Sequence, residues 1–255
     1  MQGDNALRPR HGSPADPGEE VRDAATVIVG RDTSEGLEVF MVRRHTGAAF
    51  LPDRYVFPGG RVDDADRDEA QRRLRGSAGD VDPAYAMTAA RETFEEVGLL
   101  FASSPLDLDA LAVLRREMNG GGLAFGDVLE QLDIVIDASQ LRYFSRWITP
   151  KAEIATRRFD TRFFVARAPR DQVAEADATE VSDGRWFSPA GALAANTRGE
   201  INLIFPTIKH LERIAPFRTV DEMLAFAATK TIVTVTPEVQ PGPKFIMISE
   251  LENAW

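Results

Sequence analysis

The segment RETFEEVG, from Arg91 to Gly98, constrains this chain more than any other part of the sequence. It places the carboxylates of Glu92, Glu95 and Glu96 three and four residues apart, and these offsets fall on one face of an α-helix. Like charges on one helix face repel each other. A hard divalent cation removes the repulsion because it prefers several anionic oxygen ligands. The segment therefore predicts a helix that carries metal-binding carboxylates.

Signals for both ends of this helix flank the carboxylates. Asp82 is a favourable N-cap, Pro83 a favourable first helical residue, and Gly98 a favourable C-terminal stop. Apolar residues recur at helical spacing on another face, at Met87, Ala90, Phe94 and Val97. We therefore predict a helix from Pro83 to about Val97, with the apolar face in the core.

A glycine pair precedes the helix. The segment YVFPGG, from Tyr55 to Gly60, is a short apolar strand that ends in Gly59 and Gly60. Because glycine has no side chain, such a pair lets the backbone approach a ligand closely. A strand, a glycine loop and a carboxylate-lined helix together indicate metal-assisted chemistry on a phosphate.

The remaining patterns predict an α/β fold, with helices around a mixed sheet. Strands are expected at residues 24–29, 37–43, 56–57, 142–148, 158–166, 184–187 and 231–235. Further helices are expected at residues 106–118, 125–132, 189–195, 205–214 and 220–229. The charged stretch 61–81 is expected to be a surface insertion, and its residues 64–79 to be solvent-exposed and open to shortening at little cost in stability. We expect a disordered tail at 1–20, one domain at 21–235 and an extended tail at 236–255.

Composition narrows the classes of partner. The net charge is −10 with no basic stripe, which argues against nucleic acid. The absence of cysteine excludes disulfides, thiolate zinc sites and cysteine nucleophiles. No apolar run approaches a membrane span, and residues 1–20 lack the apolar core of a secretory signal, so we expect a cytoplasmic protein without a membrane partner. The sequence leaves the oligomeric state open and allows a homodimer.

The glycine pair followed by RExxEExG resembles the Nudix box of the Nudix hydrolases, G-x5-E-x7-R-E-U-x-E-E-x-G-U, where U is apolar. The fixed positions are taken by Gly60, Arg91, Glu92, Glu95, Glu96, Gly98 and Leu99, and Thr93 departs from the apolar preference. The resemblance implies a Nudix α/β/α sandwich with a mixed sheet, here with a C-terminal helical extension.

The box is split in this chain. Arg91 stands 31 residues after Gly60, whereas the pattern has 14, so about 17 residues are inserted. Counted back from Arg91, the first glutamate of the box falls on Pro83; either Asp82, one position away, substitutes for it or the role is vacant. In the family that glutamate helps to anchor the arginine, and Glu95 is the other candidate partner of Arg91.

The split box, the segments FSRWITP and RRFDTRFFVA and the tail helices resemble the branch of coenzyme A and acyl-coenzyme A diphosphatases. This implies a Mg²⁺- or Mn²⁺-dependent hydrolase that cleaves a pyrophosphate bond in a small-molecule nucleoside diphosphate, with coenzyme A or acyl-coenzyme A favoured. One alternative is a pyrophosphatase acting on nucleotide sugars or dinucleoside polyphosphates. Another is a Nudix ligand sensor without turnover, against which the intact glutamates argue.

The resemblance also implies roles for individual residues. Glu95 and Glu96 are the expected principal metal ligands, Glu92 is a third ligand or the base, and the Gly60 carbonyl is a further ligand. A remote acidic residue is expected to complete the site, and the candidates are Glu153, Glu175 and Glu180.

Arginines are the natural phosphate ligands because they are permanently charged and bidentate. One of Arg43 and Arg44 should face the site, and Arg61, directly after Gly59 and Gly60, could touch phosphate. Candidates for reading a coenzyme A 3′-phosphate are Arg157, Arg158 and Arg162. Packing or surface roles rather than chemistry are expected for His45, His210, Trp147 and Trp186.

Overall fold

The computed structural model describes residues 20–45, 47, 52–151, 157–177, 181–240, 244–246 and 255. The predicted N-terminal tail, apart from Glu20, lies outside the described residues. So do two of the candidate remote ligands, Glu153 and Glu180.

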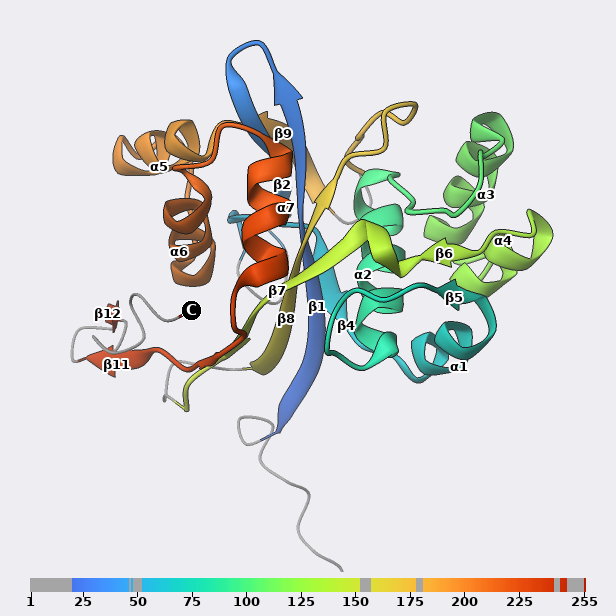
Figure 1. Ribbon diagram of the computed structural model, residues 1–255, viewed down its shortest axis with the longest axis horizontal. Coiled ribbons are helices and arrows are strands. Elements are labelled where there is room, and N and C mark those ends of the chain that lie inside the picture. The colour runs from blue at the N-terminus through green and yellow to red at the C-terminus, as the bar shows by residue number, and fades with distance from the viewer. Residues whose placement is uncertain are drawn as a thin grey trace, which may run out of the picture.

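A mixed sheet forms the centre of the molecule (Figure 1). Its longer strands are β1 (Val21–Thr33), β2 (Gly36–Arg44), β7 (Leu141–Ile148), β8 (Arg158–Arg167) and β9 (Val181–Phe187). Its short strands are β3 (Tyr55–Val56), β4 (Gly59–Arg61) and β10 (Thr234–Val235). The strand order is β10-β7-β8-β1-β2-β3, with β4 paired to β1 and β9 paired to β2. Because β8 runs parallel to β1 whereas β2 and β4 run antiparallel to it, the sheet is mixed, as predicted.

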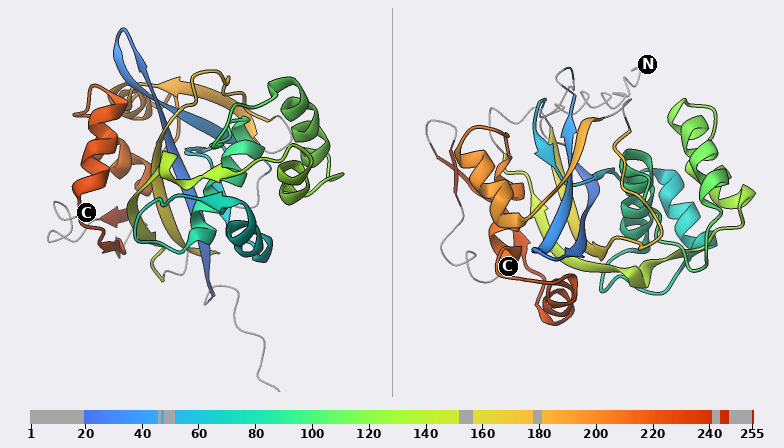
Figure 2. Two further views of the ribbon diagram at one scale, coloured as in Figure 1. Left: turned by 45° about the vertical axis from the view of Figure 1, so that its right-hand side comes forward. Right: turned by 90° about the horizontal axis from the view of Figure 1, so that it is seen from above.

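Helices cover both faces of the sheet (Figures 1 and 2). One face carries α1 (Asp64–Arg73), α2 (Pro83–Val97), α3 (Leu108–Asn119) and α4 (Phe125–Gln131), and the other carries α5 (Pro189–Thr197), α6 (Phe205–Ile214) and α7 (Val220–Thr229). Smaller elements are β5 (Leu74–Arg75), β6 (Ile136–Asp137), a 3₁₀ turn at Ala138–Gln140, and the pair β11 (Glu238–Gln240) and β12 (Lys244–Ile246). The α/β/α sandwich is confirmed. None of the helices in the described part of the chain has the length and apolarity needed to cross a membrane.

The sheet separates two hydrophobic cores. On β2, Phe40 and Val42 pack in the core that contains α2, whereas Val39 and Met41 pack in the core beneath α5 to α7. This alternation follows from the two-residue period of a strand, which sends successive side chains to opposite faces. Away from the register shifts of the sheet, a strand residue can therefore be assigned to the α2 face or to the other face.

The bounds of α2 are those predicted. The Asp82 side chain accepts a hydrogen bond of 2.9 Å from the Ala84 N–H at the start of the helix. At its end Gly98 adopts the left-handed conformation, with φ 73°, and its N–H donates to the Phe94 carbonyl at 2.9 Å. The four predicted core residues of this helix are all buried.

The prediction for residues 61–81 is correct only in part. Most of the stretch is exposed, as expected, but it contains α1, which packs against α2 and buries Asp66, Glu69 and Ala70. The local signals of this helix are acidic residues in its first turn, at Asp64 and Asp66, and basic ones in its last turn. Its charged residues belong to one solvated face and to two buried carboxylates, those of Asp66 and Glu69, rather than to a loop without packing.

Candidate active site

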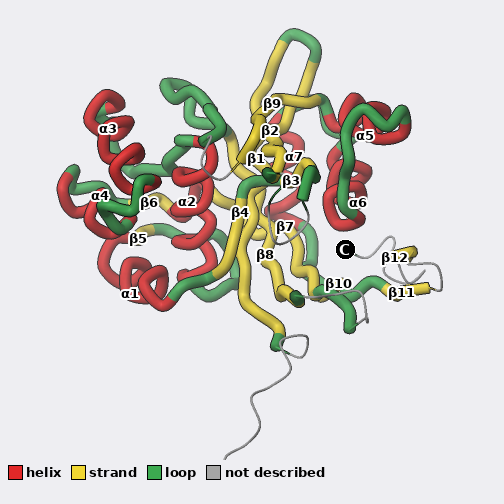
Figure 3. The backbone as a smooth tube through the Cα atoms, turned by 180° about the vertical axis from the view of Figure 1, so that it is seen from behind, coloured by secondary structure: helices red, strands yellow, loops and turns green. Residues whose placement is uncertain are grey.

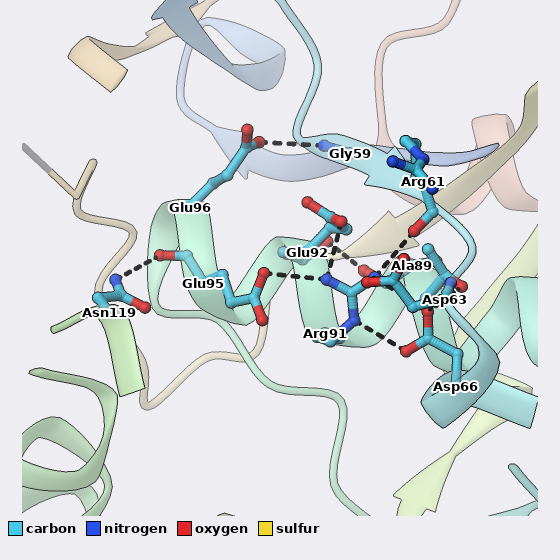
Figure 4. Close-up of polar contacts among 12 residues, drawn as sticks. Gly59, Arg61, Asp63, Asp66, Ala89, Arg91, Glu92, Glu95, Glu96 and Asn119 are labelled. Carbon is cyan, nitrogen blue, oxygen red and sulfur yellow. Dashed lines mark hydrogen bonds and ion pairs between the residues drawn. The ribbon is translucent and has the colours of Figure 1, made fainter. Parts of the chain in front are cut away.

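The last turn of α2 lies against the glycine pair of β4 (Figures 3 and 4). The Glu96 side chain, only 4% exposed, accepts a hydrogen bond of 3.0 Å from the Gly59 N–H. A Cβ atom on Gly59 would lie 2.4 Å from the Ala25 carbonyl oxygen, so no other residue fits there without a shift of the strand. The backbone of β4 and the carboxylate of Glu96 therefore fix each other.

Gly60 makes room for a second carboxylate. A Cβ atom at this position would lie 2.4–2.6 Å from the carboxyl atoms of Glu92. Gly60 pairs with Ala25 in the sheet, and Ala25 belongs to the core that contains α2. The close backbone approach expected of the glycine pair is thus made, within the chain itself, by Glu92. The Gly60 carbonyl as a metal ligand stays a prediction.

Arg91 connects the carboxylates of α2 to two other elements (Figure 4). Its Nη1 donates to Glu92 at 2.8 Å and to Glu95 at 3.0 Å, and its Nη2 donates to the Arg61 carbonyl at 2.9 Å. Its Nε and Nη2 donate to the two carboxylate oxygens of Asp66 at 2.8 and 2.9 Å. Burial alone would lower the pKa of Arg91. The bonds to Asp66 and the charges of Glu92, Asp66 and Glu95 outweigh it and raise that pKa, so the guanidinium stays charged.

Asp66, not Asp82, takes the anchoring role that the box assigns to its first glutamate. The Asp66 side chain is 2% exposed and also accepts hydrogen bonds from Thr88 Oγ1 and the Asp63 N–H. Asp82 instead caps α2 and lies 3.4 Å from Arg67. Counting back from Arg91 missed Asp66 because the inserted residues follow it. Counting forward finds it six residues after Gly60, the position of the glutamate in G-x5-E.

The carboxylates of α2 meet the chemical requirement for a divalent metal. Glu92, Glu95 and Glu96 offer hard anionic oxygens, and those of Glu92 and Glu96 lie beside a glycine backbone, which suits Mg²⁺ or Mn²⁺. Arg91 already compensates part of their charge, because it bridges Glu92 and Glu95. Within the described residues, no three acidic or histidine side chains converge as a formed metal cluster. The donor set thus fits a metal, while its assignment as ligands stays a prediction.

The structure separates the three arginines expected at the phosphate. Arg44 pairs with Val181, a residue of the α2 core, and so shares the face of α2. Arg43 pairs with Tyr55, a residue of the other core, and its guanidinium binds Asp53. Arg61 is exposed and neighbours Gly60 in β4, so its side chain points to the face opposite that of Gly60. Of these three, Arg44 alone shares the face of the carboxylates.

The candidates for the 3′-phosphate and the remote ligand have other contacts. Arg162 lies 4.1 Å over the Tyr85 ring and pairs with Asp160 and Asp23, and Arg158 Nε donates to the Thr149 carbonyl. Arg157 is exposed. Glu175 is exposed as well, but its backbone N–H donates to the Val97 carbonyl at the end of α2.

The packing roles expected of the core aromatic residues are confirmed. His210 is fully buried, contacts Ser145 Oγ at 2.7 Å and stacks on Phe163 with a ring separation of 4.0 Å. Burial lowers the pKa of His210 to about 3, so its ring is neutral. Trp147 is buried beside it, and Trp186 packs edge-on against Phe40 beneath the Arg31 guanidinium.

The family model, the solved structures and the sequence relatives that match this chain agree on one family. Residues 68–214, more than half of the chain, match the NUDT19 Nudix domain. A crystal structure of a NUDIX hydrolase from Alicyclobacillus acidocaldarius is 32% identical, with a TM-score of 0.69 over 81% of this chain and 96% of that one. The acyl-coenzyme A diphosphatase NUDT19 of Xenopus laevis is 23% identical over 83% of this chain and 73% of its own length. The human protein of the same name is 26% identical over 78% of this chain and 66% of its own length.

Proposed function

This chain belongs to the NUDT19 Nudix domain family, and we propose that it hydrolyses the pyrophosphate bond of coenzyme A or acyl-coenzyme A. The products would be 3′,5′-ADP and phosphopantetheine or its acylated form. The frog and human relatives, both named acyl-coenzyme A diphosphatases, support this substrate class. The chain is a Nudix pyrophosphohydrolase that acts on a small-molecule substrate. Mg²⁺ or Mn²⁺ is the proposed identity of its divalent metal.

One observation carries the proposal: Glu92 and Glu96 of α2 meet the glycine pair of β4, while Arg91 is locked between Asp66, Glu92 and Glu95. A bound divalent cation would neutralise phosphate charge and acidify a water molecule. Glu95 and Glu96 are the proposed principal ligands. Glu92, held against Gly60, is the third ligand or accepts the proton of the attacking water.

Substrate recognition is proposed to involve Arg44. It ends β2 on the face of α2, so its guanidinium is the one of the three candidates on the same side of the sheet as the carboxylates. A permanently charged guanidinium can bind two phosphate oxygens at once. Losing such a charge-assisted contact costs roughly 1.5–3 kcal/mol.

A substrate panel tests the proposal. The purified chain is incubated with Mg²⁺ or Mn²⁺ and, separately, with coenzyme A, an acyl-coenzyme A, 3′-dephospho-coenzyme A, a nucleotide sugar and a dinucleoside polyphosphate. We expect the coenzyme A species to give the highest kcat/KM and chelation by EDTA to stop turnover. Cleavage of nucleotide sugars alone would reassign the substrate, and binding without cleavage of any diphosphate would indicate a sensor.

A further inference from the structure

The last turn of α2, which carries Glu95 and Glu96, is held from outside the helix. An α-helix leaves its last four carbonyl groups without partners inside the helix. Here each of them accepts a hydrogen bond. The donors are the Gly98 N–H for Phe94, the Arg115 and Asn119 side chains for Glu95, the Asp177 N–H for Glu96 and the Glu175 N–H for Val97.

Two of these donors are side chains of α3, and both bind the carbonyl of Glu95. Arg115 Nη2 lies 3.0 Å from that oxygen. Asn119 Nδ2 also lies 3.0 Å from it (Figure 4). Arg115 Nη2 also lies 3.0 Å from the Glu175 carbonyl, so one guanidinium joins α2, α3 and the segment before β9. A Cβ atom on Gly98 would lie 2.6 Å from Arg115 Nη1, so the glycine at the helix end makes room for this guanidinium.

We propose that Arg115 and Asn119 are positioning residues that hold the Glu95–Glu96 turn in the conformation that binds the metal. The inference rests on the proposed function of the two glutamates. A cation at a helix C-terminus also interacts favourably with the helix dipole, so Arg115 stabilises this turn through its charge as well as its hydrogen bonds. Both residues belong to α3, outside the Nudix box, so this helix contributes to the site by holding the turn that carries the glutamates.

Hydrogen bonds to the Glu95 carbonyl also fix the positions of the Glu95 and Glu96 carboxylates, because all three groups belong to the same helical turn. The two ligands are adjacent residues, and their carboxylates point to different partners: Glu95 to Arg91 and Glu96 to Gly59. A small rotation of the last turn moves both carboxylates relative to β4. Groups that orient metal ligands without binding the metal typically change metal affinity or activity by about ten- to hundred-fold when removed.

The test uses the full chain and the variants Arg115→Ala, Asn119→Ala and Arg116→Ala. Arg116 is the matched control, because it is the next residue of the same helix and is exposed. Mn²⁺ binding to the substrate-free protein is measured by electron paramagnetic resonance, alongside kcat, KM and the melting temperature. We expect Arg115→Ala to weaken Mn²⁺ binding and lower kcat about tenfold or more, with a smaller change in KM. Asn119→Ala should act in the same direction and Arg116→Ala should match the wild type.

The outcomes separate this inference from the proposed function. Should the folded Arg115→Ala and Asn119→Ala proteins bind Mn²⁺ and turn over like Arg116→Ala, the positioning role is overturned while the proposed function stands. The role is also overturned if a variant has a lower melting temperature but binds Mn²⁺ like the wild type at temperatures where it is still folded. That result would show that the contact is purely structural. If Arg115→Ala does not fold, Asn119→Ala decides alone. A wild-type protein that binds no Mn²⁺ refutes the metal site and the positioning role together.

Discussion

Replacing Asp66 by Asn should damage both stability and turnover, although Asp66 lies outside the helix that carries the glutamates. The carboxylate is 2% exposed and accepts four hydrogen bonds: two from Arg91, one from Thr88 and one from the Asp63 N–H. Asn keeps the size but removes the charge and turns one acceptor atom into a donor. In either orientation that donor faces a donor of Arg91: Nε at one position, or Nη2 together with Thr88 and the Asp63 N–H at the other.

The expected loss of stability follows from the burial of the Arg91–Asp66 ion pair. Removing one partner of a buried ion pair costs about 3–5 kcal/mol. Arg91 keeps Glu92, Glu95 and the Arg61 carbonyl, so we expect the lower end of that range, about 3 kcal/mol. At roughly 2–4 °C per kcal/mol for a chain of this size, the melting temperature should fall by about 6–12 °C. Turnover should fall about ten- to hundred-fold, because Arg91 orients Glu92 and Glu95.

Asp82→Asn is the control, because Asp82 is the other acid that the box suggested. Asn caps a helix as well as Asp does. The pair of Asp82 with Arg67 is exposed, and such pairs contribute about 0–1 kcal/mol. Thermal unfolding by circular dichroism and steady-state hydrolysis of coenzyme A measure the two effects. Equal melting temperatures and equal kcat for the two variants would refute the anchoring role of Asp66.

Four further predictions concern the α2 glutamates, Gly60, Arg44 and Lys230. Glu95→Gln and Glu96→Gln should each lower kcat by orders of magnitude with an unchanged circular dichroism spectrum, and near-normal activity in both would remove the metal-ligand assignment. Gly60→Ala should displace Glu92, whose carboxyl atoms lie 2.4–2.6 Å from the added Cβ, and lower kcat. Gly47→Ala, whose added Cβ has no atom of the described residues within 4 Å, should not. Arg44→Ala should lower kcat/KM for coenzyme A about ten- to hundred-fold, the equivalent of roughly 1.5–3 kcal/mol, and Arg43→Ala should lower it less. A larger loss of kcat/KM in Arg43→Ala than in Arg44→Ala would place the phosphate on the other face of the sheet. Burial, with repulsion from Arg213, lowers the pKa of Lys230 to about 8 from 10.5, so the unfolded chain binds more protons between these pH values and this residue makes stability rise with pH there. The melting temperature of the wild type relative to Lys230→Met should therefore increase from pH 8 to pH 10, and a constant difference would contradict the burial of the charge.

Local signals were sufficient to predict α2. Its N-cap, its first-turn proline and its glycine stop all act within one turn of the helix ends, so Asp82 and Gly98 could be read from the sequence alone. The strands β1 and β2 are also joined locally, by a short turn in which Thr33 pairs with Gly36. Elements of two or three residues such as β3 and β4 carry no periodicity, and their pairing depends on the rest of the sheet.

The site required tertiary information. Arg91 and Asp66 are 25 residues apart, and the intervening stretch looked like a charged loop because α1 has a small apolar face. The alternation of β2 predicts that Arg43 and Arg44 point to opposite faces, but which face holds α2 depends on packing. The helix that contains Arg115 was predicted from its pattern. Its contact with the Glu95 carbonyl depends on how α3 docks on α2.

The mass of the products formed from one acyl-coenzyme A tests the central claim most directly. The wild type and Glu96→Gln are incubated with the substrate and Mg²⁺ or Mn²⁺, and the products are identified by mass spectrometry. The account predicts 3′,5′-ADP and the acylated phosphopantetheine from the wild type, and orders of magnitude less of both from Glu96→Gln. Hydrolysis at the thioester, no cleavage with either metal, or equal product from the two proteins would contradict it.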